Sequence, residues 1–138
     1  MLKKSILFIF MLSGLLMAEI IWQPSYRIAK EEAQKQNRPM LVILVSHTCR
    51  WCRKLENRTL QNPEIVAYVN KYFVPVLIYR EDGNFPDFIS SSLVPTTFFL
   101  TPDEKNIVKP AMGYWDPDDY MSDLTLAIDK FKKHRAPR

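Results

Sequence analysis

Six consecutive apolar residues, Met40 to Val45, constrain the fold of this chain more than any other feature. Because no polar side chain interrupts the run, the segment cannot turn one face to the core and the other to solvent. Its valines and its isoleucine favour a strand over a helix. A continuous apolar strand of this kind lies inside a sheet that is covered on both faces. We therefore expect an α/β fold with helices on both sides of the sheet.

The rest of the chain supplies the covering helices and the other strands. Capping residues mark three helix starts, Ser25, Asn62-Pro63 and Asp116-Pro117. The pattern predicts helices over residues 25–37, 50–60, 62–72 and 116–133, and strands over 40–45, 73–79, 97–100 and 106–112. The first two strands are expected to be parallel and the last two to form an antiparallel hairpin. The result is one domain, residues 19–138, with a mixed four-stranded sheet between helices.

Residues 1–18 have the parts of a secretory signal. Lys3 and Lys4 are positive, residues 5–17 are uncharged and mostly apolar, and Ala18 is a small residue at the expected cleavage site. The apolar run is shorter than the roughly 20 residues of a spanning helix. Leu16 stands where cleavage sites prefer a small side chain, so an uncleaved membrane tether is the alternative. No cysteine follows the run, which excludes a lipoprotein. We expect an exported protein, which in a bacterium is periplasmic.

Charge and cysteine content exclude several classes of function. The 138 residues contain 19 Lys and Arg against 15 Asp and Glu. Without the two signal lysines, 17 basic residues remain against 15 acidic ones, a net charge of +2 that is too small to indicate nucleic-acid binding. Two cysteines cannot form a disulfide-dense scaffold or complete a four-cysteine metal site. We expect no cofactor and no resident metal, and for one small domain we expect a monomer.

Both cysteines lie in one motif, Cys49-Arg50-Trp51-Cys52, between the apolar strand and the next helix. A Cys-x-x-Cys pair in that context is typical of a redox-active dithiol. At a helix N-terminus the first cysteine faces unpaired N–H groups and the positive end of the helix dipole, which favour its thiolate. Arg50 and Arg53 add positive charge. Cys52, one turn further on, is placed to attack a mixed disulfide formed by Cys49.

Two other interpretations of the motif remain open. His47, Cys49 and Cys52 offer three soft ligands for copper or for an open zinc site. The pair is also compatible with an inert structural disulfide, although so small a ring stabilises little. Haem attachment is excluded because Arg53, and not a histidine, follows the second cysteine.

With these residues the sequence resembles the thioredoxin superfamily across nearly all of residues 19–138. The resemblance rests on the apolar strand before Cys49, on the triplet Val94-Pro95-Thr96, whose proline lies 46 residues after Cys49, on the hairpin that ends at Gly113, and on the final amphipathic helix. The segments Tyr26-x-x-Ala29, 54–56 and 62–64 are similar to an exported branch of the superfamily. That branch includes the C-terminal periplasmic domain of the transmembrane disulfide interchange reductase.

The resemblance implies a role for each matching residue. Cys49 would be the exposed nucleophile and Cys52 the buried resolving thiol. Pro95 would be a cis-proline that shapes the client groove, and the backbone of Val94 would pair with an extended client segment. Thr96, the last residue of the triplet, would contact the client as well. Trp51 would grip apolar client residues.

The chain also departs from thioredoxin itself. Thr48 replaces the tryptophan before the first cysteine, and Arg50-Trp51 replaces Gly-Pro between the cysteines. The buried acid that helps to deprotonate the resolving cysteine is replaced by Ile43. Another group or water must then accept that proton, and Glu56 is the candidate. His47 is a second candidate for tuning the dithiol.

The sequence thus predicts an exported thiol–disulfide oxidoreductase that acts on protein thiols or disulfides. It favours a reductase, which would receive its electrons from a membrane thiol reductase. The alternative is a non-catalytic protein of the same fold that holds copper or a client through His47, Cys49 and Cys52. The sequence leaves open the direction of electron flow, the client, the cleavage of the signal and the oligomeric state.

Overall fold

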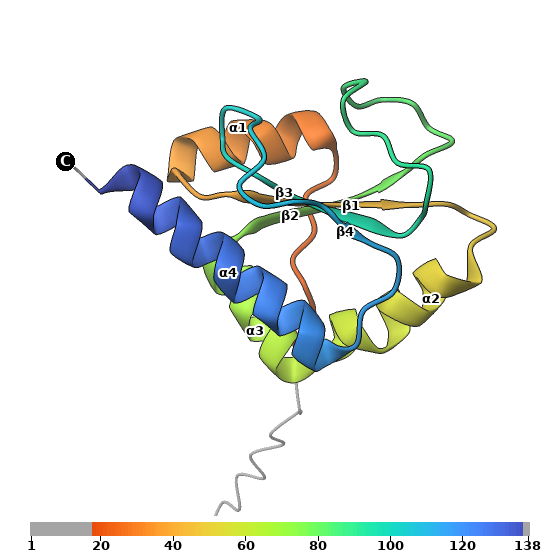
Figure 1. Ribbon diagram of the computed structural model, residues 1–138. Helices are drawn as coiled ribbons and strands as arrows, with labels where there is room; N and C mark the ends of the chain where they lie inside the picture. The colour runs from red at the N-terminus through yellow and green to blue at the C-terminus, as the bar shows by residue number, and fades with distance from the viewer. Residues whose placement is uncertain (1–17, 137–138) are drawn as a thin grey trace, which may run out of the picture.

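The computed structural model describes residues 18–136 as one α/β unit in which a four-stranded sheet lies between helices (Figure 1). The predicted fold class is confirmed. The elements in chain order are α1 (Tyr26–Gln36), β1 (Met40–Val45), α2 (Arg50–Asn57), the 3-10 turn η1 (Thr59–Gln61), α3 (Pro63–Tyr72), β2 (Val74–Tyr79), β3 (Thr96–Leu100), β4 (Ala111–Met112) and α4 (Pro117–Arg135). The expected signal at residues 1–18 lies, apart from Ala18, outside the described residues.

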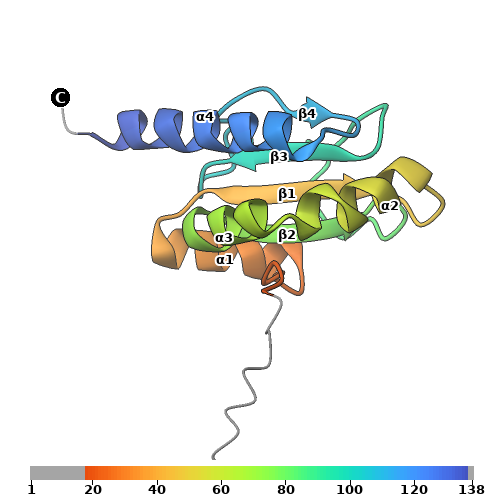
Figure 2. The ribbon, with the colours of Figure 1, turned by 90° about the horizontal axis from the view of Figure 1, so that it is seen from below.

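The sheet has the strand order β2-β1-β3-β4, with β1 inside. As expected, β1 is parallel to β2, in a register that places Ile43 beside Leu77. β3 is antiparallel to both β1 and β4. α1 covers one face of the sheet, while α2, α3 and α4 lie on the other (Figures 1 and 2).

Alternate residues of β1 enter two separate hydrophobic cores. Leu41, Ile43 and Val45 pack toward the side of α3 and α4. Met40, Val42 and Leu44 pack with the buried residues of α1 on the opposite side. Every residue of β1 is at most 1% exposed, which explains the uninterrupted apolar run in the sequence.

The helices begin where their capping residues predict. Ser25 accepts a hydrogen bond from the Ile28 N–H at 3.2 Å, and Asp116 accepts one from the Asp119 N–H at 3.0 Å. Asn62 accepts from the N–H groups of both Glu64 and Ile65. These side chains satisfy amide groups that the first turn of a helix leaves unpaired.

Most element boundaries agree with the prediction to within two residues, and two elements differ by more. The strand expected over 106–112 is reduced to an isolated bridge between Leu100 and Asn106 and to the two residues of β4. Pro110, which has no N–H to donate to a neighbouring strand, separates these two pairings. The helix expected over 50–60 ends at Asn57, and the chain tightens into η1 before α3 starts.

Candidate active site

Cys49 is the N-cap of α2, so the sulfur lies at the point where the helix exposes unpaired N–H groups. The backbone N–H of Cys52 donates to Cys49 Sγ at 3.1 Å. A hydrogen bond to sulfur and the positive end of the helix dipole both stabilise negative charge there. The local fold therefore supplies Cys49 with thiolate stabilisation from backbone groups alone.

Cys49 and Cys52 form a disulfide, with their Cα atoms 5.2 Å apart. The two sulfurs differ in their surroundings. Cys49 is partly exposed, whereas Cys52 is 0% exposed and belongs to the core between the sheet and α3 and α4. An incoming thiol or disulfide can therefore reach Cys49 and not Cys52.

The loop before β3 faces the dithiol from a distant part of the chain. The Val94–Pro95 peptide bond is cis, and the carbonyl oxygen of Val94 lies 3.6 Å from Cys49 Sγ. The Pro95 carbonyl accepts a hydrogen bond from the Gly113 N–H at 2.7 Å, which ties this loop to the segment after β4. Chain segments around residues 49, 94 and 113 thus meet at one place.

Thr96 supports that loop from behind. Its side chain is buried, and its hydroxyl donates to the Leu93 carbonyl at 2.6 Å and pairs with Ser91 Oγ at 3.0 Å. Thr96 therefore positions the loop and presents no side chain to a client, although we expected it among the client-contacting residues.

A groove of about 400 Å³ lies next to the dithiol. Its lining consists of Trp51, Leu93, Val94, Gly113 and Tyr114. Trp51 and Leu93 are each 47% exposed, so apolar side chains meet solvent beside the reactive sulfur. Trp51 and Val94 are predicted from the sequence as client-binding residues, whereas Leu93, Gly113 and Tyr114 are not. The available signal was their position, directly before the proline triplet and at the end of the hairpin.

His47 lies two residues before Cys49, and its side chain contacts Tyr79 and Asp82. Its ring stacks on Tyr79, with ring centroids 4.0 Å apart, and its Nε2 is 4.0 Å from Asp82 Oδ1. Among residues 18–136 no three His, Cys, Asp or Glu side chains gather as metal ligands. In the disulfide form that this structure contains, His47, Cys49 and Cys52 are not arranged as a set of metal ligands.

A polar network holds the chain on the other side of Cys49. The Ser46 hydroxyl donates to the carboxylate of Glu81, which holds the pKa of that carboxyl below its usual range. The Arg53 guanidinium donates to the Ser46 carbonyl at 2.9 Å and pairs with Glu56 at 2.7 Å. Together these contacts connect the loop before Cys49 to α2 and to the end of β2.

Glu56 lies four residues after Cys52, and thus on the same side of α2. Its side chain is 24% exposed and lines a second cavity of about 400 Å³ together with Trp22 and Leu77. Ile43 is fully buried beside Leu77, so no acid occupies the position of the family's buried carboxylate. Arg50 is exposed, with its guanidinium 5.6 Å from the centre of the Trp51 ring.

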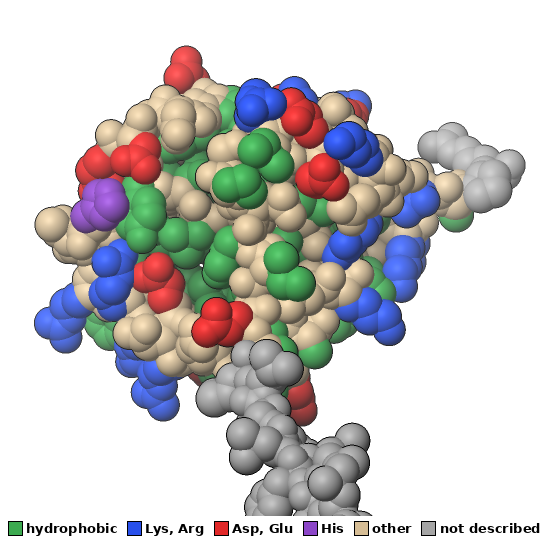
Figure 3. Space-filling view, turned by 180° about the vertical axis from the view of Figure 1, so that it is seen from behind, with side chains coloured by type: hydrophobic (Ala, Val, Ile, Leu, Met, Phe, Trp, Pro, Cys, Tyr) green, Lys and Arg blue, Asp and Glu red, His purple; other side chains and the backbone are tan. Residues whose placement is uncertain are grey.

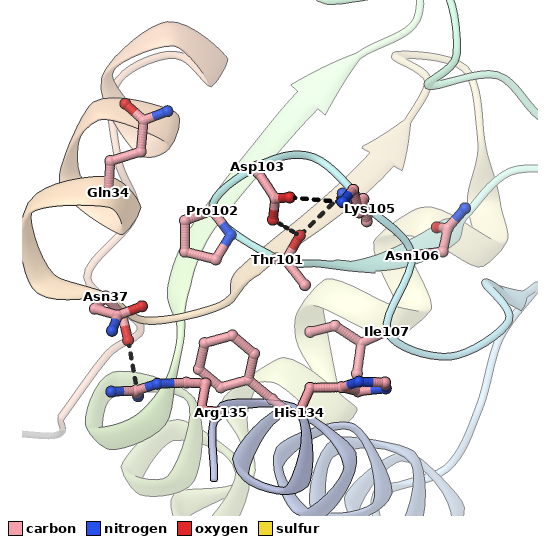
Figure 4. Close-up of a pocket in the computed structure, with 11 residues that line it drawn as sticks. Gln34, Asn37, Thr101, Pro102, Asp103, Lys105, Asn106, Ile107, His134 and Arg135 are labelled. Atoms are coloured by element: carbon pink, nitrogen blue, oxygen red, sulfur yellow. Dashed lines mark hydrogen bonds and ion pairs between the residues drawn. The ribbon is translucent and has the colours of Figure 1, made fainter. Parts of the chain in front are cut away.

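Another cavity, of about 570 Å³, lies away from the dithiol, between the end of α1, the turn after β3 and the end of α4 (Figure 4). Its charged side chains are engaged with neighbours. Asp103 pairs with Lys105 at 3.1 Å, and Arg135 donates to the Asn37 carbonyl at 3.2 Å. No cysteine lines this cavity, which separates it from the redox chemistry.

Over residues 11–132 the chain matches the family model Thioredox_DsbH, which is described as a protein of unknown function, DUF255. The match covers most of the chain. The chain belongs to this family. The predicted membership of the thioredoxin superfamily is thereby confirmed. Spermatogenesis-associated protein 20 of Rattus norvegicus is 30% identical over 131 residues, which cover 83% of this chain and 16% of that protein. The chain thus spans about a sixth of the length of that curated relative.

Solved structures confirm the fold at low sequence identity. A thioredoxin from Thermus thermophilus superposes with a TM-score of 0.70 at 20% identity, covering 88% of this chain and 100% of that one. The DsbD C-terminal domain of Neisseria meningitidis, in the oxidised form, gives a TM-score of 0.54 at 16% identity and covers 72% and 89% of the two chains. For this Thioredox_DsbH family member, family, fold and paired cysteines together support thiol–disulfide oxidoreductase activity.

Proposed function

We propose that this protein is an exported thiol–disulfide reductase that acts on protein clients. One observation carries the proposal: a partly exposed Cys49 sulfur at a helix N-terminus lies against the Val94 carbonyl, beside an open apolar groove, while its partner Cys52 is buried. A structural disulfide does not need a groove at one sulfur, and a client-reducing dithiol does.

The proposed reaction begins with the reduced protein. The Cys49 thiolate attacks one sulfur of a client disulfide, forms a mixed disulfide and releases the other client sulfur as a thiolate, which takes a proton from solvent. Cys52 then loses its proton and attacks Cys49 Sγ, which releases the second client thiolate. The client has gained two electrons and two protons, and the protein ends in the disulfide form that this structure contains.

The proton of Cys52 needs an acceptor because Ile43 offers none. We assign that role to Glu56, on the same side of α2 and at the wall of a cavity that leads to solvent. Its ion pair with Arg53, at 2.7 Å, fixes the position of the carboxylate on this side of α2. We assign His47, stacked on Tyr79, and Arg50, near Trp51, to tuning the stability of the thiolate.

Client binding would use the groove and the loop before β3. An extended client segment would pair with the backbone of Val94, while the shape made by the cis Pro95 and the aromatic face of Trp51 would receive its side chains. Thr96 would contribute indirectly by holding Leu93 and Val94 in place.

Export is supported by the sequence of residues 1–18 and by how the following segment attaches. The Asn70 side chain donates to the Glu19 carbonyl and accepts from the Ile21 N–H, each at 2.9 Å. Cleavage after Ala18 would therefore leave these attachments intact. Within residues 18–136 no helix is long and apolar enough to span a bilayer. The mass of the protein recovered from cells decides between cleavage and a retained tether.

The electron donor would be a membrane thiol reductase, because an exported reductase has to be returned to the dithiol form. The test of direction is the reduction potential of the Cys49–Cys52 couple, measured by equilibration with glutathione or dithiothreitol. A value near that of thioredoxin, about −270 mV, supports a reductase. A value near about −120 mV means a donor of disulfides and overturns the reducing direction.

Two single substitutions test the assigned roles of the cysteines. Cys49→Ser is expected to abolish the reduction of a protein disulfide. Cys52→Ser is expected to stop the cycle at the mixed disulfide, which a non-reducing gel detects as a covalent protein–client species. Reduction at the wild-type rate by Cys49→Ser contradicts the proposal.

A further inference from the structure

Lys54 occupies an unusual position at the groove beside the dithiol. Its ammonium group lies 4.9 Å from the centre of the Trp51 ring and 4.6 Å from the centre of the Tyr114 ring. The two ring centres are themselves 6.1 Å apart. One cation is thus held against both aromatic walls of the groove, where attraction to the ring faces fixes its place.

Within the part of the chain that the structure describes, no acidic side chain pairs with the Lys54 ammonium at this place. On α2, Arg53 is paired with Glu56, but within residues 18–136 neither Lys54 nor Arg50 has a carboxylate within ion-pair distance. Basic side chains gather over the edge of the molecule that α2 forms (Figure 3). The acids on the other side of Cys49 are engaged elsewhere, Glu81 by Ser46 and Asp82 near His47.

The groove and the reactive sulfur are continuous because they share Val94, which lines the groove and lies 3.6 Å from Cys49 Sγ. A client segment whose cysteine reaches Cys49 therefore places neighbouring residues against Trp51 and Tyr114. Those residues meet two aromatic faces and, with them, the ammonium of Lys54 and the nearby guanidinium of Arg50.

We propose that Lys54, assisted by Arg50, selects client segments that carry an acidic residue next to an apolar one beside the reacting disulfide. This inference rests on the proposed function and adds a class of client to it. The apolar side chain would fill the groove, and the carboxylate would pair with the unpaired cation. Exposed ion pairs are modest in strength, so the expected preference is about two- to fivefold in rate over a neutral client.

The test uses three short peptides that each contain one internal disulfide and differ at one position. Beside the reacting cysteine and a phenylalanine they carry glutamate, glutamine or lysine. The fully reduced protein is mixed with each peptide, and the second-order rate constant is followed by tryptophan fluorescence. The measured quantity is the ratio of the glutamate rate to the glutamine rate. Any effect of a substitution on the Cys49 thiolate itself acts on both peptides equally and cancels in that ratio.

We expect a ratio of about two to five for the wild type, with the lysine peptide slowest. Lys54→Gln should bring the ratio toward one, and Lys54→Arg should retain it. Lys132→Gln is the matched control, because the Lys132 ammonium also lies over an aromatic ring, 5.2 Å from the centre of Tyr72, away from the groove. It should leave the ratio unchanged. In the wild type alone, raising the salt concentration from about 0.05 M to about 0.5 M should also bring the ratio toward one.

The possible outcomes distinguish a failure of the acidic-client assignment from a failure of the reductase proposal. If all three peptides react at one rate, or if Lys54→Gln keeps the full glutamate preference, the assignment of acidic clients is overturned and the reductase proposal stands. If the wild-type protein reduces none of the peptides, the reductase proposal itself falls, and the client class with it. The salt dependence of the wild type decides the matter even if a Lys54 variant folds poorly.

Discussion

At the scale of single residues, a hydrogen bond between Thr97 on β3 and Tyr120 on α4 joins the sheet to the last helix. The two hydroxyl oxygens are 2.9 Å apart, and neither side chain is more than 1% exposed. Burial raises the pKa of the Tyr120 phenol above its usual range, since a phenolate would lose its hydration in the core. The folded protein therefore keeps a proton on Tyr120 at a pH where the unfolded chain releases it.

Alkaline pH should for this reason destabilise the protein. Above about pH 10 the unfolded chain binds fewer protons than the folded one, so the free energy of unfolding falls by up to about 1.4 kcal/mol per pH unit for this residue. Tyr120→Phe should make that fall shallower. At pH 8 the substitution should lower the free energy of unfolding by about 1–3 kcal/mol, because Thr97 loses its buried hydrogen-bond partner. Urea unfolding at pH 8 and above about pH 10 checks this. If the free energy of unfolding falls equally with pH in the wild type and the variant, the prediction is contradicted.

At the scale of elements, the short helices depend on their first residues more than on their length. α3 has only 10 residues, too few to be stable alone, and Asn62 satisfies two amide groups of its first turn. The position of α3 also matters for the site, because α3 and η1 come directly after α2, the helix that carries the dithiol, in the chain.

Asn62→Ala should lower the free energy of unfolding by about 1 kcal/mol, the usual cost of a lost helix cap. Asn62→Asp is the matched control, since a carboxylate caps equally well and complements the helix dipole. It should remain within about 0.5 kcal/mol of the wild type. Equal destabilisation by both substitutions would show that Asn62 acts through something other than capping. Urea unfolding of the three proteins provides the measurement.

At the scale of the whole molecule, Arg38 connects segments that are far apart in sequence. It follows α1 and precedes β1, and its guanidinium donates to the carbonyls of Asn70 at 2.8 Å and Phe73 at 2.6 Å. These carbonyls lie at the end of α3, where cations are favoured and backbone acceptors lack partners within the helix. One side chain thus joins both sides of the sheet at the end opposite the dithiol.

Arg38→Met should lower the free energy of unfolding by about 2–4 kcal/mol, because it removes charge-assisted hydrogen bonds and leaves two acceptors without their donor. Arg27→Met is the matched control. Arg27 is 73% exposed and pairs only within α1, so its loss should cost less than about 0.5 kcal/mol. Thermal unfolding of both variants provides the comparison, and similar losses for the two would contradict a connecting role for Arg38.

The sequence predicted most of the architecture because its signals are local. A strand buried on both faces needs an unbroken apolar run, and residues 40–45 have one. Helix starts need capping groups within three residues, and Ser25, Asn62 and Asp116 provide them. The strand before Gly113 was overestimated, because strand pairing depends on a partner elsewhere in the chain and Pro110 weakens that pairing.

By itself the sequence determined the place of the dithiol, at the junction of a buried strand and a helix, because both signals lie within a few residues of one another. Tertiary structure alone decided what surrounds it. The groove combines segments near residues 51, 93 and 114, and the ammonium of Lys54 finds two rings that lie 63 positions apart in the chain, Trp51 and Tyr114. Such contacts depend on how the sheet brings distant loops to one edge, and no local pattern of residues encodes that distance.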